Sequence, residues 1–389
     1  MNKKKILLSV AATSMIAITG AVLAINGGLK NSSVFATNDV VWYHYAAVEP
    51  TPTRHGSREF WASSTDKCAT HQFVNPGVAS IDRNFLDNEY FYSLTNEDDR
   101  YIAPTSSSPR INGNTVTYGI YPQTVLTDEE LVSNLDNDAT EQTNGWFLYR
   151  GEYYAKVSAT PYDSNYTFDN GTKIKSGTTY WFKCEPITWN VLPNTNGEYI
   201  LSSVLLDVHC YYDFESAGYE YDEYRTINNK KVYRNNYEYS DIRSWLNNEF
   251  YNSAFALGKS HIQTTTVDNS ASTTFSDENS YASEETTKDN VFLPSYKDYT
   301  NGSYGFSAPD NPDDARRCCK TTDWARARGA WYDTRYWPYN GDYWTRSPSS
   351  EEYDVVSSVA YTGWVKASEW KVVDQAWVCV RPALSIKIL

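Results

Sequence analysis

The chain has 389 residues, which is enough for one large domain or for two to three domains of ordinary size. Its hydrophobic fraction of 41% argues against a chain that is disordered throughout. The net charge of −14 argues against nucleic acid or an anionic lipid surface as a partner, because phosphate groups would be repelled.

Aromatic residues are frequent, with 33 Tyr and 13 Trp against only 2 Met. Their rings pack well on a pleated surface, and we take sheet packing as the main reason for their number. The same side chains offer a wide contact area with a polar tip, so a recognition surface is the second interpretation.

The first residues, "MNKKKILLSVAATSMIAITGAVLAINGG", place three lysines before an apolar run over residues 6–25. This order is typical of a secretory signal, and Val34 and Ala36 lie at the positions that a signal peptidase reads. We expect a signal peptide over residues 1–36 and a mature protein that is extracellular or on the cell surface. The alternative is an uncleaved membrane anchor, because about 20 apolar residues can span a bilayer.

Residues 40–104 differ in composition from the rest and predict a small β module that contains Trp and His. Cys68 and His71 have the two-residue gap with which two ligands grip one tetrahedral zinc ion. His44 and His55 are the other candidate ligands, but their spacing is loose and no second tight pair is present. We therefore predict no metal and no cofactor, with zinc as the alternative.

Ser and Pro residues over residues 105–110 predict a linker, and a larger domain follows over residues 111–389. Its first strand, in "TVTYGIYPQT", is expected to stop at Pro122. Tyrosine-rich strands flank the turn in "LYRGEY". The segment "TYWFKCEPITWNVLPNTNGEYILSSVLLD" predicts a hairpin, because the Asn-Gly pair in "NTNG" suits a turn with positive φ.

Two helices are predicted. The main helix, "SDIRSWLNNEFYNSAF", begins at the capping residue Ser240 and places four apolar side chains on one face: Ile242, Trp245, Leu246 and Phe250. A short second helix runs from its cap at Thr322 to Gly329. The polar residues 267–290 predict a long exposed loop. Strands grouped before and after helices indicate the α+β class, with mixed β-sheets, one main amphipathic helix and a short second helix.

Three arginines, Arg243, Arg346 and Arg381, lie within the most apolar motifs. A guanidinium group there needs several acceptors, so we predict that these residues lock the fold, with ligand binding as the alternative. Trp245 is predicted to contribute to the same core.

No catalytic motif stands out: the sequence has no HExxH, no Gly-rich phosphate loop and no Ser elbow. His209 and Cys210 are adjacent, but neighbouring residues on a strand point to opposite faces, so we expect no contact between them. Six cysteines do not make a disulfide scaffold in a chain of this size. Cys318 and Cys319 could pair with each other, although separate partners or free thiols are favoured.

Seven motifs occur in an order that resembles a bacterial domain-of-unknown-function family of secreted and surface proteins, mostly from Gram-positive organisms: "YGIYPQT", "WFKCEPITWNVL", "SDIRSWLNNEFYNSAF", "VFLPSY", "TTDWARARGA", "YWTRSP" and "CVRPAL". The closing motifs are also similar to the C-type-lectin-like fold of formylglycine-generating enzymes. That similarity implies the fold but not the activity, since Cys318 and Cys319 do not match the copper-binding cysteines of those enzymes.

Between the last two motifs, small apolar residues alternate with the candidate ligand-binding residues Tyr353, Asp354, Tyr361, Trp364 and Trp370. In C-type-lectin-like folds this part commonly forms the ligand-facing surface, so the resemblance implies a binding role; burial of all four aromatic rings is the alternative. We predict a non-catalytic recognition module for an extracellular glycan or a surface protein. The other hypotheses are a secreted enzyme (a glycan hydrolase or a formylglycine-generating-like oxidase) and a structural envelope protein.

Overall fold

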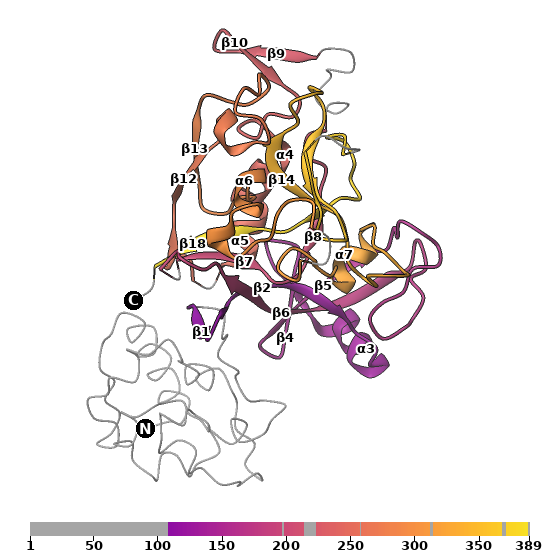
Figure 1. The fold of residues 1–389 in the computed structure, drawn as a ribbon. Helices are drawn as coiled ribbons and strands as arrows, with labels where there is room; N and C mark the ends of the chain where they lie inside the picture. The colour runs from indigo at the N-terminus through magenta and orange to yellow at the C-terminus, as the bar shows by residue number, and fades with distance from the viewer. Residues whose placement is uncertain are drawn as a thin grey trace, which may run out of the picture. The chain divides into compact units, whose positions relative to one another are not determined.

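The computed structural model describes residues 108–196, 198–213, 223–256, 258–311, 314–367 and 371–387 (Figure 1). The chain divides into two compact units, Thr105–Phe147 with Tyr153–Leu389, and Met1–Pro104 with Leu148–Glu152. Several predictions concern residues outside the described ranges: the signal peptide with its cleavage after Ala36, the β module, His44, His55, Cys68, His71 and Trp370.

The larger sheet contains nine strands: β1 (Arg110–Asn112), β2 (Thr115–Val125), β3 (Thr140–Glu141), β4 (Phe147–Tyr149), β5 (Glu152–Ser158), β6 (Thr179–Val191), β7 (Tyr199–Ser202), β11 (Ile262–Gln263) and β18 (Ala383–Ile386). Its order runs β11-β18-β7-β6-β5-β4-β3, and β2 pairs with β1 and β6. The long strand β6 is therefore the centre of this sheet: β2 pairs along most of its length, β5 with its first residues and β7 with its last.

Strand β2 does not stop at Pro122, contrary to the prediction from the sequence. It runs on to Val125, and the antiparallel pairing with β6 shifts register between Pro122 and Thr124. A proline has no N–H to donate to the ladder, and such an irregularity is where a strand can accommodate one. The prediction failed because it assumed that a proline ends a strand, whereas an irregularity in the pairing can accommodate a proline within one.

The predicted turns are confirmed. Arg150 and Gly151, between β4 and β5, both have positive φ, at 49° and 82°. Strands β6 and β7 pair antiparallel, and the connection between them has positive φ at Asn194 (60°) and Asn196 (53°). Asparagine tolerates the left-handed region better than other side chains, which is why the "NTNG" segment could be recognised in advance.

A second sheet has five strands: β8 (Asp207–Val208), β14 (Tyr343–Pro348), β15 (Val356–Val359), β16 (Val365–Lys366) and β17 (Cys379–Val380). Their order is β16-β15-β14-β17-β8, and β14 is buried along its whole length. The chain passes from β17 directly to β18 of the larger sheet. Arg381 lies in this crossing and donates from Nε to the Ser202 carbonyl at 2.8 Å, which ties the crossing to β7.

The main helix is confirmed, with an irregular centre. It consists of α4 (Asp241–Trp245), the π-helical turn η6 (Leu246–Phe250) and α5 (Tyr251–Ala254). The Ser240 hydroxyl accepts from the Arg243 N–H at 3.2 Å, as expected for the cap. All four side chains of the predicted apolar face are buried, among them Ile242 and Leu246 with no exposed surface.

The second predicted helix is also confirmed, as α7 (Asp323–Ala327). The Thr322 hydroxyl accepts from the Ala325 N–H at 3.1 Å, and Gly329 follows with φ of 107°. A side chain at Gly329 would be strained by that φ, and its Cβ would lie 3.1 Å from the Thr160 carbonyl. Glycine therefore ends the helix where the sequence indicated.

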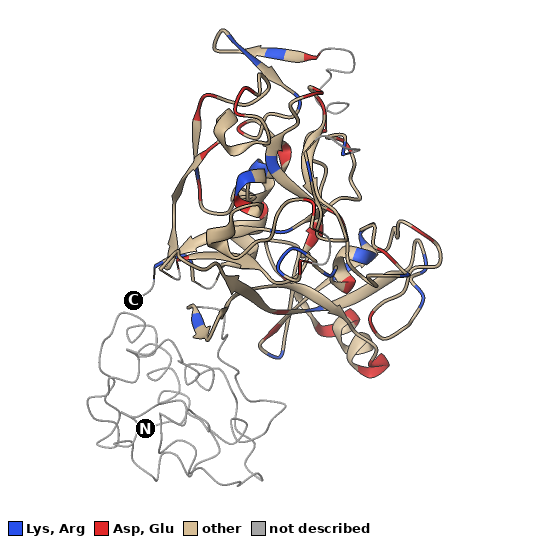
Figure 2. Ribbon diagram, viewed as in Figure 1, with Lys and Arg blue, Asp and Glu red and all other residues tan. Residues whose placement is uncertain are grey.

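The remaining helical segments are short: α3 (Glu129–Asp138), η7 (Ala271–Thr273), α6 (Tyr296–Tyr299) and η8 (Gly302–Tyr304). Helix α3 begins with two glutamates, which are red in Figure 2 and interact favourably with the positive end of the helix dipole. Its cap, Asp128, accepts from the Glu130 N–H at 3.0 Å and from the Leu131 N–H at 3.1 Å.

The prediction of a long exposed loop over residues 267–290 is wrong. This segment contains most of a hairpin, β12 (Thr265–Asp268) with β13 (Thr286–Asp289). Its polar side chains are buried in several places: Asn279 donates from Nδ2 to the Pro348 carbonyl at 3.0 Å, and Asp289 is fully buried. Small polar residues replace apolar contacts here by hydrogen-bonding to backbone, so hydrophobicity alone did not reveal the hairpin.

A further two-stranded sheet is formed by β9 (Tyr224–Ile227) and β10 (Lys230–Tyr233). Together these elements make a mixed, mostly sheet architecture with a few short helices, which agrees with the α+β class (Figure 1). In the described part of the chain, no helix has the length and apolar character that a bilayer crossing requires.

Candidate functional site

The structure separates the predicted ligand-binding residues into two groups. Tyr361 and Trp364 lie in the turn between β15 and β16, where the Gly363 N–H donates to the Ala360 carbonyl at 2.8 Å. Tyr353 and Asp354 immediately precede β15 and so lie at its other end. The four of these residues that the structure describes therefore do not form one site.

Tyr361 belongs to a chain of aromatic side chains that contact one another. Its ring lies 5.2 Å from the ring of Trp331 and 5.6 Å from that of Trp337, between centroids, and Trp337 lies 6.1 Å from Tyr336. Tyr336 is 77% exposed, and the other three rings are half-buried. We call these four residues, Trp331, Trp337, Tyr336 and Tyr361, the aromatic row.

A second aromatic pair continues from the row. The Trp331 N–H donates to the Trp377 carbonyl at 3.2 Å, and the Trp377 ring lies 5.6 Å from that of Tyr162. Tyr162 is 50% exposed, and the ammonium group of Lys371 lies 4.1 Å from the centroid of the Trp377 ring. Partly exposed rings thus come together from four segments of the sequence: Tyr162, residues 331–337, Tyr361 and Trp377.

Two aspartates hold the loops that carry the row. Asp342 accepts the Tyr361 N–H through Oδ1 at 2.8 Å and forms an ion pair with Lys371 through Oδ2 at 2.6 Å. Asp333 Oδ2 accepts the N–H groups of Tyr336 and Trp337, each at 2.7 Å. These carboxylates satisfy backbone amides, so the rings are positioned before any ligand arrives, which lowers the entropy cost of binding.

The surroundings of the row are acidic. Burial raises the pKa of the Tyr361 hydroxyl, and the negative charges of Asp333 and Asp342 raise it further. The hydroxyl therefore stays protonated at neutral pH and can both donate and accept a hydrogen bond.

Trp364 has a different environment from Tyr361. Its side chain is 42% exposed, and the Lys366 ammonium lies 3.6 Å from the ring centroid. It shares the β15–β16 turn with Tyr361 but has no ring contact with the row among the described residues. One face of this tryptophan is therefore already covered by a cation of the protein itself.

Tyr353 and Asp354 lie close to the β9–β10 hairpin instead. The Arg234 guanidinium is 5.8 Å from the Tyr353 ring centroid, and the Tyr353 carbonyl accepts the Asn235 N–H at 3.0 Å. Asp354 is one of the negative charges that raise the pKa of Tyr281, after burial and Tyr233. This second group belongs with residues that the sequence analysis did not single out.

The three predicted fold-locking arginines have protein acceptors around them. Arg243 donates from Nε to Asp289 Oδ1 at 2.7 Å, and Arg346 donates from Nη1 to Asp298 Oδ2, also at 2.7 Å. Trp245 is 9% exposed and belongs to the hydrophobic core. That these residues and Arg381 lock the fold stays a prediction.

The expectation that His209 and Cys210 do not touch is wrong. The Cys210 sulfur lies 4.0 Å from His209 Nδ1, because β8 ends at Val208 and the alternation of a strand no longer applies. Burial raises the pKa of the Cys210 thiol to about 11, and Asp213 and Asp241 contribute in the same direction. The pair therefore lacks the thiolate that a nucleophile needs.

Other reactive groupings are sparse in the described ranges. The five cysteines found there, including Cys318 and Cys319, form no disulfide bond, and no group of His, Cys, Asp and Glu side chains within the same ranges could hold a metal ion. The sequence analysis missed Trp331, Tyr336 and Trp337. Their segment, "WYDTRYWPYN", is dense in aromatic residues, and that density was the available signal.

Comparison with known proteins gives a family without a known activity. Residues 197–388 match the model of a family described as a domain of unknown function (DUF6273). This match confirms the resemblance to such a family over the second part of the larger domain, and it includes the aromatic row. No curated protein and no solved structure shows a significant match to the chain.

Proposed function

We propose that the protein is a non-catalytic recognition module that binds an extracellular glycan through the aromatic row. The observation that carries the proposal is the contact of Tyr361 with Trp331 and Trp337, which places partly exposed rings side by side. Sugar rings pack their apolar faces on aromatic side chains, and nearby polar groups orient them. The row offers aromatic faces and polar groups together, because the Tyr336 hydroxyl and the loops that Asp333 and Asp342 hold lie beside the rings.

A glycan screen on the purified protein tests this proposal. We expect binding of at least one cell-surface polysaccharide and its loss when Tyr361 and Trp337 are both replaced by Ala. A matched control is Phe275→Ala, since Phe275 is 56% exposed but contacts Tyr296 and lies outside the row. Binding of a surface protein without any glycan would support the other class of partner, and binding of neither would contradict the recognition proposal.

Export follows from the sequence pattern of residues 1–36 and belongs to the same proposal. The lysine-rich start and the apolar run are its support. N-terminal sequencing of material from the culture medium should give a protein that begins near Thr37. An intact Met1 in the membrane fraction would instead show an uncleaved anchor.

The C-type-lectin-like fold is the finer assignment that we propose for residues 111–389. Its support is the combination of a large sheet centred on β6 with a second sheet, β14 and its neighbours, joined by the closing crossing at Arg381. An experimental structure with a different strand order would contradict it.

A further inference from the structure

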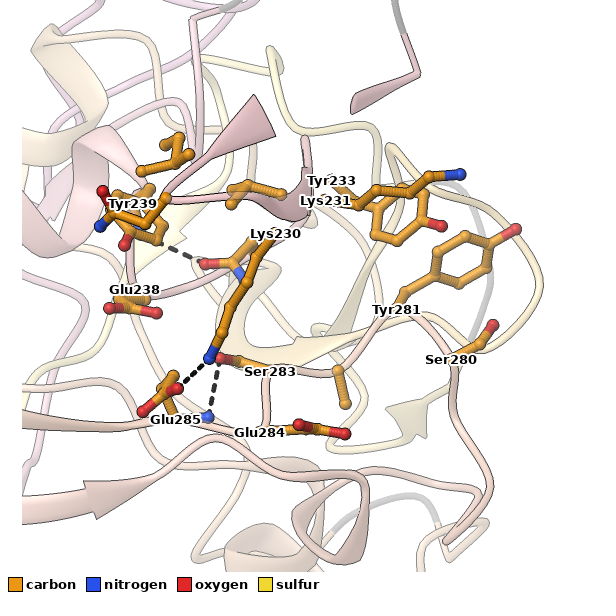
Figure 3. Close-up of a pocket in the computed structure, with 15 residues that line it drawn as sticks. Lys230, Lys231, Tyr233, Glu238, Tyr239, Ser280, Tyr281, Ser283, Glu284 and Glu285 are labelled. Atoms are coloured by element: carbon orange, nitrogen blue, oxygen red, sulfur yellow. Dashed lines mark hydrogen bonds and ion pairs between the residues drawn. The ribbon is translucent and has the colours of Figure 1, made fainter. Parts of the chain in front are cut away.

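A second candidate binding site lies away from the aromatic row, between the β9–β10 hairpin and residues 280–285 (Figure 3). It is a cavity of about 540 Å³. Its walls include the hydroxyl-bearing rings of Tyr233, Tyr239 and Tyr281. We call this cavity the tyrosine pocket.

One end of the tyrosine pocket is aromatic. The rings of Tyr233 and Tyr281 meet edge to face, with centroids 4.9 Å apart, and Figure 3 shows the two side chains next to each other. Burial raises the pKa of Tyr281, and the neighbouring Tyr233, Glu352 and Glu223 raise it further. The ring pair therefore sits in a negative field, which a cation would neutralise.

The other end carries an excess of carboxylates. Glu238, Glu284 and Glu285 all line the pocket. Figure 3 shows the Lys230 side chain running across to Glu285, with which it forms an ion pair. Neither Glu238 nor Glu284 has an ion pair with any residue of the described ranges. The second lysine of the wall, Lys231, has its ammonium 4.2 Å from the centroid of the Tyr224 ring and so is directed to an aromatic face.

Contacts within the protein indicate that the walls of the tyrosine pocket suit basic groups. Around the pocket, basic side chains lie on tyrosine faces: besides Lys231, Arg225 is 5.8 Å from the centroid of Tyr239, and Arg234 is 5.8 Å from that of Tyr353. Lysine and arginine are thus the groups that these rings and carboxylates already hold. An additional basic group would find Glu238 and Glu284, two carboxylates without an ion pair in the described ranges, and the Tyr233–Tyr281 pair.

We propose that the tyrosine pocket binds a lysine or arginine side chain of a polypeptide partner, with Glu238 and Glu284 as the counter-charges and Tyr233 and Tyr281 as the aromatic wall. A charged hydrogen bond from the ligand to each carboxylate, together with contact to the rings, provides the affinity. This inference is independent of the glycan site, because it uses no residue of the aromatic row.

Titration of the purified protein with tetralysine and tetraarginine peptides tests the inference, with tetraglutamate as the negative control. We expect saturable binding of a basic peptide that weakens as salt rises from low to physiological concentration. The double variant Glu238→Gln with Glu284→Gln should weaken binding by at least about tenfold, because two charge-assisted contacts are lost. Tyr281→Leu should also weaken it, while Glu141→Gln, an exposed acid on β3, should not.

The melting temperature and glycan binding of each variant are measured alongside, and both should match those of the parent protein. Equal peptide binding by the parent and the double variant would overturn the proposal, as would an absence of peptide binding by the parent. Binding of a glucosamine tetramer without binding of either peptide would also overturn the proposal, since the pocket would then bind an amino sugar rather than a polypeptide side chain. Loss of glycan binding in a row variant that keeps peptide binding would show that the two sites are separate.

Discussion

The aromatic row and the tyrosine pocket contain similar residues but arrange them differently. In the row, rings contact rings, and the carboxylates are already occupied: Asp333 by backbone N–H groups, and Asp342 by the Tyr361 N–H and the Lys371 ammonium. In the pocket, Glu238 and Glu284 line the cavity and form no ion pair within the described ranges. The partners of the carboxylates therefore distinguish a surface suited to a neutral sugar from one suited to a cation. The numbers of tyrosines and acidic residues alone would not distinguish the two surfaces.

The largest expected effect tests whether both regions depend on one core. Trp245→Ala should destabilise the larger unit by about 3–5 kcal/mol, because deletion of a buried large aromatic leaves a cavity. Chemical denaturation would measure the change, and both binding activities should weaken together near the new transition. A loss below about 1 kcal/mol would show that Trp245 contributes little to the core.

The next effect should separate the two regions. Asp342→Ala removes the acceptor of the Tyr361 N–H and leaves Lys371 buried without its partner, so we expect a loss of about 3 kcal/mol. Glycan binding should fall because the row loop is no longer held, while binding of basic peptides should be unchanged. Asp342→Asn, which keeps an acceptor for the N–H group, is the matched control and should lose less glycan binding. Equal loss of both ligands would mean that the two sites are coupled.

Alkaline pH should lower the stability of the protein through Tyr166, which packs against Tyr332 beside the aromatic row. Burial raises the pKa of Tyr166 to about 12, and its ring lies 3.9 Å from that of Tyr332, between centroids. The unfolded chain loses this proton near pH 10, so the contribution of Tyr166 is complete below pH 10 and is lost as pH rises through its folded pKa. Melting curves from pH 9 to 12 should show the decline, and Tyr166→Phe should reduce it. An identical decline in that variant would assign the alkaline loss to other buried tyrosines.

The smallest expected effect concerns Trp364. Its half-exposed ring is covered by Lys366 and does not contact the row, so Trp364→Ala should change stability by less than about 0.5 kcal/mol. We expect only a slight weakening of glycan binding. A loss as large as that of Tyr361→Ala would extend the site across the β15–β16 turn.

Local signals in the sequence predicted two helices and the turns, although helix α3 was missed. Ser240 and Thr322 cap the helices that they were expected to cap, and Asn196 takes the positive φ that the turn requires. Each of these features depends on residues within a few positions of one another. The β12–β13 hairpin was missed because its buried Asn279 and Asp289 are satisfied by partners that lie far away in the sequence.

The candidate site was predictable only in part for the same reason. Tyr361 was singled out from its own segment, but Trp331 and Trp337 reach it from a loop about thirty residues earlier. Tyr353 and Asp354 were grouped with Tyr361 because they are near it in the sequence, whereas β15 separates them in space. Periodicity gives the face of an element, and it contains no information on which loops meet at the surface.

The most direct test of the glycan proposal is the affinity of Trp337→Ala for a polysaccharide that the parent protein binds, measured together with the melting temperature. Trp337 is half-buried and contacts both Tyr336 and Tyr361, so its removal interrupts the aromatic row. We predict at least tenfold weaker binding, which is about 1.4 kcal/mol, with a nearly unchanged melting temperature and with Phe275→Ala as the unaffected control. Full affinity in a folded Trp337→Ala protein would contradict the proposal that the row binds the glycan.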